Sequence, residues 1–132
     1  MRGMDVDCSM LVDLLLADER LTALLPSDLT GYKAIYQILS PQAEMFPRLA
    51  IFEAAREYTA WADDAPTQER TVYRIDIYSR ENILRSVNAA LHRCLSENGF
   101  RRLSQATDDY LPDEAIYVKS VNYEHYESLL EG

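Results

Sequence analysis

Several residue types are scarce in this sequence, and each shortage removes a class of function. Two cysteines, Cys8 and Cys94, are too few for a disulfide scaffold and by themselves cannot close a structural zinc site. The four glycines are scattered at positions 3, 31, 99 and 132, so the chain has no glycine-rich phosphate loop.

Basic residues are also few. Thirteen Lys and Arg stand against 22 Asp and Glu, which gives a net charge of −9 and a pI near 4.6. This balance argues against nucleic acid and against an anionic membrane surface as partners. No apolar run approaches the roughly 20 residues that span a bilayer, and no apolar signal segment follows Met1. We therefore expect synthesis in the cytosol.

The remaining composition is that of a globular domain. The 132 residues are 48% apolar and 27% charged, which suits one domain, 1–132, with a real hydrophobic core.

The clearest pattern is a strand at residues 71–79 that runs into an amphipathic helix. Apolar Tyr73, Ile75 and Ile77 alternate with polar residues, as in a half-buried strand. Ser79 is the expected helix N-cap. The apolar stripe from Ile83 to Leu95 has helical spacing and includes Cys94, which we expect to be buried. Gly99 should end the helix in a left-handed conformation, with Phe100 packing on Leu95 in a Schellman motif.

The other patterns complete the predicted fold. Residues 4–25 predict a helix of about three turns and a short second one, broken near residues 18–20 and ended by Pro26. Strands are expected at 33–39, 48–55, 100–107 and 115–123, with an acidic turn at 108–114. Residues 124–132 form a polar C-terminal tail, either extended or one helical turn. The order predicts an α+β domain: an antiparallel or mixed sheet of four to five strands with two helices packed against it.

Residues 56–68 separate two strongly predicted strands. They form either a long hairpin tip or a lengthened, twisted hairpin that projects from the sheet. Trp61, the only tryptophan, then either folds back on the core edge or contacts a partner, because Trp and Tyr dominate interface hot spots. The candidate subunit or partner contacts are Arg56, Tyr58, Trp61, Asp63 and Asp64.

Catalytic signals are weak. His92 lies beside the apolar stripe of its helix, where a surface or boundary position is expected, and His125 lies in the polar tail. The loop acids are more simply a solvated face than a cation site or an acid/base pair, and the spacing of a calcium loop is missing. These acids are Asp63, Asp64, Asp108, Asp109, Asp113 and Glu114. The sequence predicts no catalytic residue, cofactor or metal site.

Several short motifs follow one another over about two-thirds of the chain. They are Ile35-Tyr36 with Pro41, Phe46-Pro47-Arg48-Leu49 with Phe52-Glu53, Tyr58 with Asp63-Asp64, Tyr73 through Ser79, Asn98 through Arg102, and Ile116-Tyr117-Val118-Lys119 with Tyr123. No single motif is diagnostic, but in their order and spacing the chain resembles the tail-completion (tail-to-head joining, neck) proteins of long-tailed bacteriophages and prophages.

The resemblance implies a non-enzymatic structural protein without cofactors. Such proteins form a ring, typically of six copies, that terminates the tail tube and joins it to the head connector. The implied partners are further copies of the chain, the tail-tube protein and the head-connector or stopper protein. The implied location is the tail–head junction of the virion, with the host cytoplasm before assembly. The acidic charge would keep free subunits apart until an assembling tail presents a template.

Two other readings remain open on the residues alone. A small dimeric α+β ligand-binding or regulatory module would have a closed apolar pocket between helix and sheet. A metal-assisted hydrolase would bring the pair Asp63-Asp64 together with Asp108-Asp109.

Overall fold

The fold is a five-stranded mixed sheet with helices on one face, as predicted for the α+β class. The computed structural model describes residues 8–37, 45–81 and 84–130, apart from the side chains of 104–107. The elements are α1 (Ser9–Leu16), α2 (Glu19–Thr22), β1 (Ile35–Gln37), β2 (Arg48–Ala62), β3 (Ala65–Ser79), α3 (Leu84–Glu97), β4 (Arg101–Leu111) and β5 (Ile116–Ser128). The sheet order is β1-β2-β3-β5-β4, with β1 parallel to β2 and the other pairs antiparallel.

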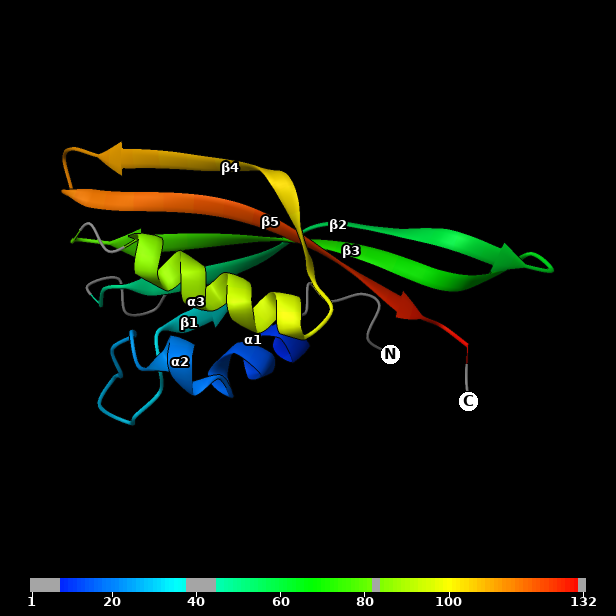
Figure 1. The fold of residues 1–132 in the computed structure, drawn as a ribbon, viewed down its shortest axis with the longest axis horizontal. Helices are drawn as coiled ribbons and strands as arrows, with labels where there is room; N and C mark the ends of the chain where they lie inside the picture. The colour runs from blue at the N-terminus through cyan, green and yellow to red at the C-terminus, as the bar shows by residue number, and fades with distance from the viewer. Residues whose placement is uncertain (1–7, 38–44, 82–83, 131–132) are drawn as a thin grey trace.

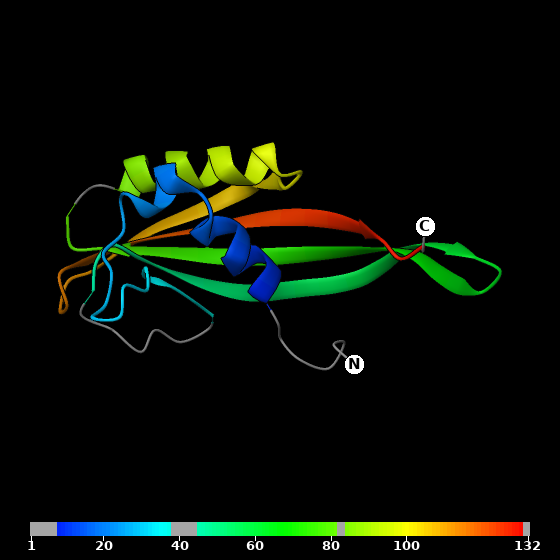
Figure 2. The ribbon, with the colours of Figure 1, turned by 90° about the horizontal axis from the view of Figure 1, so that it is seen from below.

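Helix α3 covers one face of the sheet, with α1 and α2 beside it (Figures 1 and 2). The predicted stripe is confirmed, because Val87, Ala90, Leu91, Cys94 and Leu95 are all buried. Ile83 lies outside the described residues. The buried residues that the sheet and α1 contribute to the same core cluster include Tyr73, Ile75, Ile77, Val121, Tyr123, Leu11 and Leu15.

The end of α3 is the predicted Schellman motif. Gly99 has φ +85°, and the Phe100 N–H donates to the Leu95 carbonyl at 2.9 Å. The Gly99 N–H donates to the Ser96 carbonyl at 3.4 Å. The predicted start of the helix was wrong. Ser79 ends β3, its hydroxyl donates to the Glu81 carbonyl at 2.6 Å, and the helix begins at Leu84.

The N-terminal helical region is broken where the sequence indicated. Asp18 caps α2 by accepting a hydrogen bond from the Leu21 N–H at 3.1 Å. Helix α1 has eight residues, about two turns, and residues 4–7 of the expected helical region lie outside the described part. Of the strand expected at 33–39, β1 occupies three residues, and 38–44 are not described.

The last two strands are longer than the sequence predicted. Asp108 and Asp109 belong to β4, paired with Lys119 and Val118, and the turn starts after Leu111. Lys119 also donates to Asp108 at 2.7 Å. The acidic turn at 108–114 was therefore placed too early, because a cross-strand partner keeps the acids in the strand. The first five residues of the expected tail, 124–128, continue β5, so this part is extended.

Strands β2 and β3 have 15 residues each and run well beyond the helices as a two-stranded hairpin (Figures 1 and 2). Of the two forms considered for residues 56–68, the projecting hairpin is the one found. We call residues 56–68 the arm.

Replacing Gly99 with alanine should lower the free energy of unfolding by about 1 kcal/mol, because alanine is strained in the left-handed region. An added Cβ meets no heavy atom within 4 Å, so the cost comes from the backbone alone. Chemical denaturation measures the change in the free energy of unfolding. Gly99→Asn should lower this free energy by less, since asparagine tolerates the left-handed conformation. Equal losses for the two variants would contradict this explanation.

Candidate interaction surface

We call the helix-covered part of the sheet the body. The arm extends from it past the described ends of the strands that flank β2 and β3. On one side, the described residues of β1 pair with β2 at residues 49–51. On the other, β5 accompanies β3 as far as the pair Gln68–Ser128, and Leu129 adds a hydrogen bond to the Thr67 carbonyl at 2.9 Å. Beyond this point the arm is two-stranded.

The arm carries an exposed pair of aromatic rings. Tyr58 and Trp61 are 51% and 59% exposed, and their rings meet edge to face with centroids 5.6 Å apart. Register shifts in β2 flank both residues, between Tyr58 and Ala60 and again before Trp61. Such bulges increase the local twist and redirect side chains. The arrangement excludes the alternative in which Trp61 folds back on the core edge.

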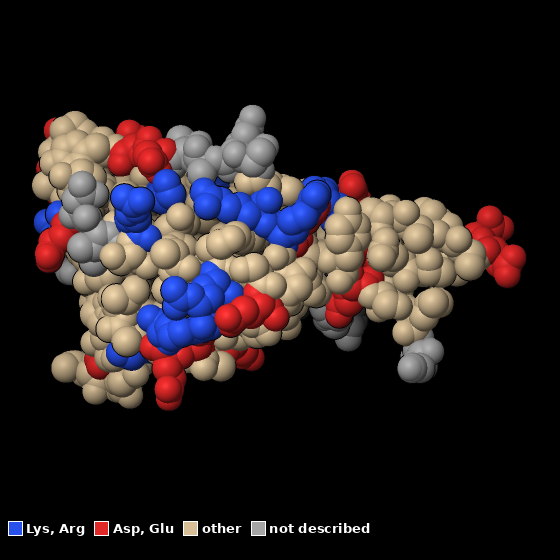
Figure 3. All heavy atoms as spheres, in the orientation of Figure 1, with Lys and Arg blue, Asp and Glu red and all other residues tan. Residues whose placement is uncertain are grey.

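Two acids form the tip of the arm. Asp63 and Asp64 have φ of 51° and 69°, the positive values of a type I′ hairpin turn. Aspartate tolerates this conformation better than most residues. Figure 3 shows the arm as a stretch with few charges that ends in these acids. The uncharged residues on the two strands next to the turn run from Tyr58 to Ala62 and from Ala65 to Gln68.

One ion-pair cluster braces the arm on the sheet face that carries α3. Arg56 donates to Glu53 and to Glu69, in each case at 2.6 Å. The Arg56 guanidinium therefore links β2 to β3. The two carboxylates raise the pKa of Arg56, and the hydrogen bond with Glu53 has the largest effect. Arg56, a predicted partner contact, thus has its charge engaged inside the chain.

A second cluster braces the arm on the other face, around Glu124. This carboxylate is 2% exposed, and it accepts from Arg70 on β3 at 2.6 Å and from Arg101 at the start of β4. Arg70 also lies 3.7 Å from Glu57 on β2. The cluster therefore links all four long strands at the root of the arm. The hydrogen bonds from the two arginines lower the pKa of Glu124, and the bond from Arg70 has the largest effect.

Sequence reasoning missed Glu124 because it placed this residue in a polar tail. The alternation of Val121 and Tyr123, both buried, continues the β5 pattern up to it. Its partners Arg70 and Arg101 lie 54 and 23 residues away. The sequence contains no signal for their meeting without the strand register.

The histidines and the remaining acids are separated. His92 is exposed, as predicted, with Nδ1 3.0 Å from the Tyr123 hydroxyl. His125 stacks on Phe100 with ring centroids 4.4 Å apart. The pair Asp63-Asp64 forms the arm tip, whereas Asp108-Asp109 lies near the β4–β5 turn at the opposite end (Figure 1). The two pairs therefore cannot share one cation, and no group of three metal-ligating side chains occurs within residues 8–37, 45–81 and 84–130.

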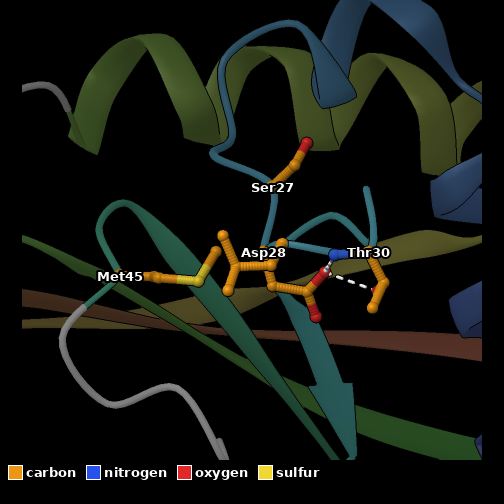
Figure 4. Close-up of a pocket in the computed structure, with 5 residues that line it drawn as sticks. Ser27, Asp28, Thr30 and Met45 are labelled. Carbon is orange, nitrogen blue, oxygen red and sulfur yellow. Dashed lines mark hydrogen bonds between the residues drawn. The ribbon is translucent and has the colours of Figure 1, made fainter.

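The surface hollows of the described structure include the following two. One, of about 390 Å³, is lined by Ser27, Asp28, Leu29, Thr30 and Met45 (Figure 4). The Asp28 carboxylate stabilises the turn in which it lies, because it accepts hydrogen bonds from the Thr30 N–H at 2.8 Å and from the Thr30 hydroxyl at 2.7 Å. The other, of about 510 Å³, lies between α1 and the root of the arm and includes Arg56, Tyr73 and His125. Between α3 and the sheet, buried side chains of both elements belong to one core cluster.

In the described part of the chain, no helix combines the length and apolar character needed to cross a membrane.

Glu124→Gln should lower the free energy of unfolding by about 2 kcal/mol, because it removes the charge that two arginines share at a buried position. Chemical denaturation at neutral pH measures the loss. The matched control is Glu57→Gln, whose carboxylate is 56% exposed and 3.7 Å from the same Arg70. It should cost less than about 1 kcal/mol, as surface ion pairs do.

The same variant tests the pH dependence. The folded-state pKa of Glu124 is lowered, so its contribution is complete above the ordinary value of 4.5 and is lost as the pH falls through the folded-state pKa. Between neutral pH and pH 3, wild type should therefore lose more stability than Glu124→Gln. Parallel losses in the two proteins would show that Glu124 is not the titrating group.

Comparison with known proteins identifies a shared fold. No family model matches the sequence, and no curated protein matches it. Among solved structures, a chain from the "Virion of native gene transfer agent (GTA) particle" superposes with a TM-score of 0.59 over 88% of this chain and 90% of that one. The two sequences are 14% identical. The protein therefore has the fold of a chain found in the virion of a gene transfer agent particle.

Proposed function

We propose that this chain is a non-enzymatic structural protein of a phage or prophage virion. In this proposal it terminates the tail tube and joins the tail to the head connector, as a ring of six copies. Its partners are neighbouring copies, the tail-tube protein and the head-connector or stopper protein. In the virion it is located at the tail–head junction, and before assembly it is located in the host cytoplasm. Residues 1–132 serve as one domain.

The observation that carries the proposal is the arm. A two-stranded hairpin without a core of its own is marginally stable in water, so its retention calls for a partner surface. Tyr58 and Trp61 expose their rings on it, and Tyr126, Leu129 and Leu130 are exposed on the segment that runs beside its root. Exposed aromatic and apolar side chains gathered at one end of a molecule are typical of an interaction site.

The shared fold supports the same class of role. The comparison chain comes from the virion of a gene transfer agent particle, and the match covers 88% of this chain. In an assembled ring, Tyr58, Trp61, Asp63 and Asp64 would contact a neighbour. Arg56 would keep the arm extended through Glu53 and Glu69.

The described titratable groups also favour a structural role. Burial raises the pKa of the Cys94 thiol to about 12, which leaves it a protonated core residue. Arg20 holds Glu97 at 2.6 Å and Asp18 at 3.0 Å, linking α2 to α3. These groups hold elements of the fold together.

Trp61→Ala should leave the thermal midpoint within about 2 °C of wild type, because an exposed side chain adds little to the core. It should nevertheless block tail–head joining in a complementation assay of the phage or prophage that encodes the chain. Counting joined and unjoined particles by electron microscopy measures the defect.

Tyr110→Ala is the matched control. Tyr110 is also exposed and lies against a second ring, Tyr117, with ring centroids 4.8 Å apart, but it lies on β4 away from the arm. This variant should complement like wild type. Full complementation by Trp61→Ala would remove the arm from the joining role, and a large loss of stability would place Trp61 in the folded core.

A further inference from the structure

The outer side of helix α3 is exposed and carries basic residues. Figures 1 and 2 show α3 at the outside of the body, over one face of the sheet. The exposed residues of α3 are Arg85, Ser86, Ala89, His92, Arg93, Ser96 and Glu97. Glu97 is the one acid in this set, and its carboxylate accepts a hydrogen bond from Arg20 at 2.6 Å. The outer side of α3 therefore presents arginines without a free acid between them.

Arg102 of β4 belongs to the same surface. It pairs with Tyr123 of β5, so both side chains lie on the face of the sheet that α3 covers. The Tyr123 hydroxyl in turn lies 3.0 Å from Nδ1 of His92. Arg102 is therefore close to the part of α3 that carries His92. We call this surface the α3 basic face; it consists of Arg85, Ala89, His92, Arg93 and Arg102.

The arginines of the α3 basic face differ from several other cations of the chain. Those others form ion pairs with carboxylates of the same molecule; they are Arg20, Arg56, Arg70, Arg74, Arg101 and Lys119. Arg85 and Arg102 have no hydrogen bond or ion pair in the described part of the chain. Arg93 acts on Glu97, one turn away, through its charge alone. In a protein of net charge −9, this surface is a local surplus of positive charge.

The tip of the arm has the opposite charge. Asp63 and Asp64 are exposed, and within the described residues neither carboxylate forms a hydrogen bond or an ion pair. The exposed rings of Tyr58 and Trp61 lie a few residues behind them. In the view of Figure 3, Lys and Arg lie over the body and acids form the tip of the arm. Guanidinium groups bind carboxylates and also stack on aromatic rings, so a surface with several arginines suits both parts of the arm.

The tip cannot reach the α3 basic face of its own chain. His92 lies at the level of Tyr123, which pairs with Tyr73 on β3. From Tyr73 to Ala65 at the turn, eight residue steps of extended strand span roughly 26 Å. Helix α3 runs toward the root of the arm, so Arg85 lies even farther from the tip than His92 does (Figure 1). Contact between the two surfaces therefore requires a second molecule.

We propose that the acidic tip of the arm of one copy docks on the α3 basic face of the next copy. Ala89 lies one turn after Arg85 and one turn before Arg93, so it leaves room for an aromatic ring of the arm between two guanidinium groups. The contact joins two different surfaces, so it is head to tail, and its repetition closes a ring when the rotation allows. The proposal rests on the function proposed above and identifies the surfaces that join its subunits.

Disulfide exchange between two differently labelled chains tests the contact. The tip chain carries Ala62→Cys, next to the turn, and the face chain carries Ala89→Cys. A control face chain carries Ala23→Cys, the same substitution at an exposed site of helical conformation that ends α2. The native Cys8 and Cys94 are buried and stay out of the exchange. Mixed dimers formed in a glutathione buffer are measured by mass spectrometry, and each yield is divided by the reactivity of that face chain toward glutathione disulfide.

We expect the corrected yield of the 62–89 disulfide to exceed that of the 62–23 disulfide at least 5-fold. Arg85→Gln in the face chain should lower this excess at least 2-fold, because it removes an unpaired charge from the docking surface. The matched control is Arg74→Gln, which removes one positive charge from the opposite face of the sheet, since Ile75 next to it lies in the core beneath α3. This variant should leave the excess unchanged.

Charge reversal tests the pairing of the two surfaces. In the tip chain, Asp63→Lys with Asp64→Gly reverses the charge and keeps a glycine that a type I′ turn prefers. This tip chain should show no excess with the original face chain, and Arg85→Glu in the face chain should restore an excess. Thermal midpoints of each variant confirm folding.

Equal corrected yields at positions 89 and 23 would overturn the docking, and so would an excess that Arg85→Gln and Arg74→Gln change equally. In either case, loss of joining by Trp61→Ala would leave the proposed function in place. An excess at position 89 that depends on Arg85, alongside normal joining by Trp61→Ala, would support the docking and count against the proposed function.

Discussion

The buried carboxylate of Glu124 is the interaction on which the shape of this protein depends. Glu124 lies on β5, at the boundary between the helix-covered body and the arm. It accepts hydrogen bonds from Arg70 of β3 and Arg101 of β4. A buried charge costs free energy unless opposite charges compensate it, so the strands must meet in this register. On the other face, Arg56 with Glu53 and Glu69 fixes β2 to β3 at nearly the same level. The arm thus begins at a point braced on both faces.

The body and the arm are stabilised in different ways. The body has a continuous core from α1 through α3 to β5, including residues as distant as Leu11 and Tyr123. The two-stranded arm has backbone pairing and one aromatic pair, Tyr58 and Trp61. This division places the apolar exposure and the acidic tip at one end of the molecule.

The sequence predicted what local periodicity determines. The α3 stripe, the Schellman motif at Gly99 and the α+β class were recovered because each depends on residues close together in the chain. Strand lengths and the Glu124 cluster were not, because they depend on partners far away in sequence. From the sequence alone Asp108 is predicted to lie in a turn, whereas in the structure it lies in β4 and pairs with Lys119 of β5. The arm was foreseen only as one of two forms, since its solvent-exposed strands lack a clear alternation of apolar and polar residues.

The most direct test of the whole account is electron cryomicroscopy of particles from the phage or prophage that encodes this chain. The account predicts a ring of six copies between the tail tube and the head connector, with the arm of each copy in contact with a neighbouring protein. Particles in which the chain is missing, or in which it lies elsewhere than at the tail–head junction, would contradict the proposed role.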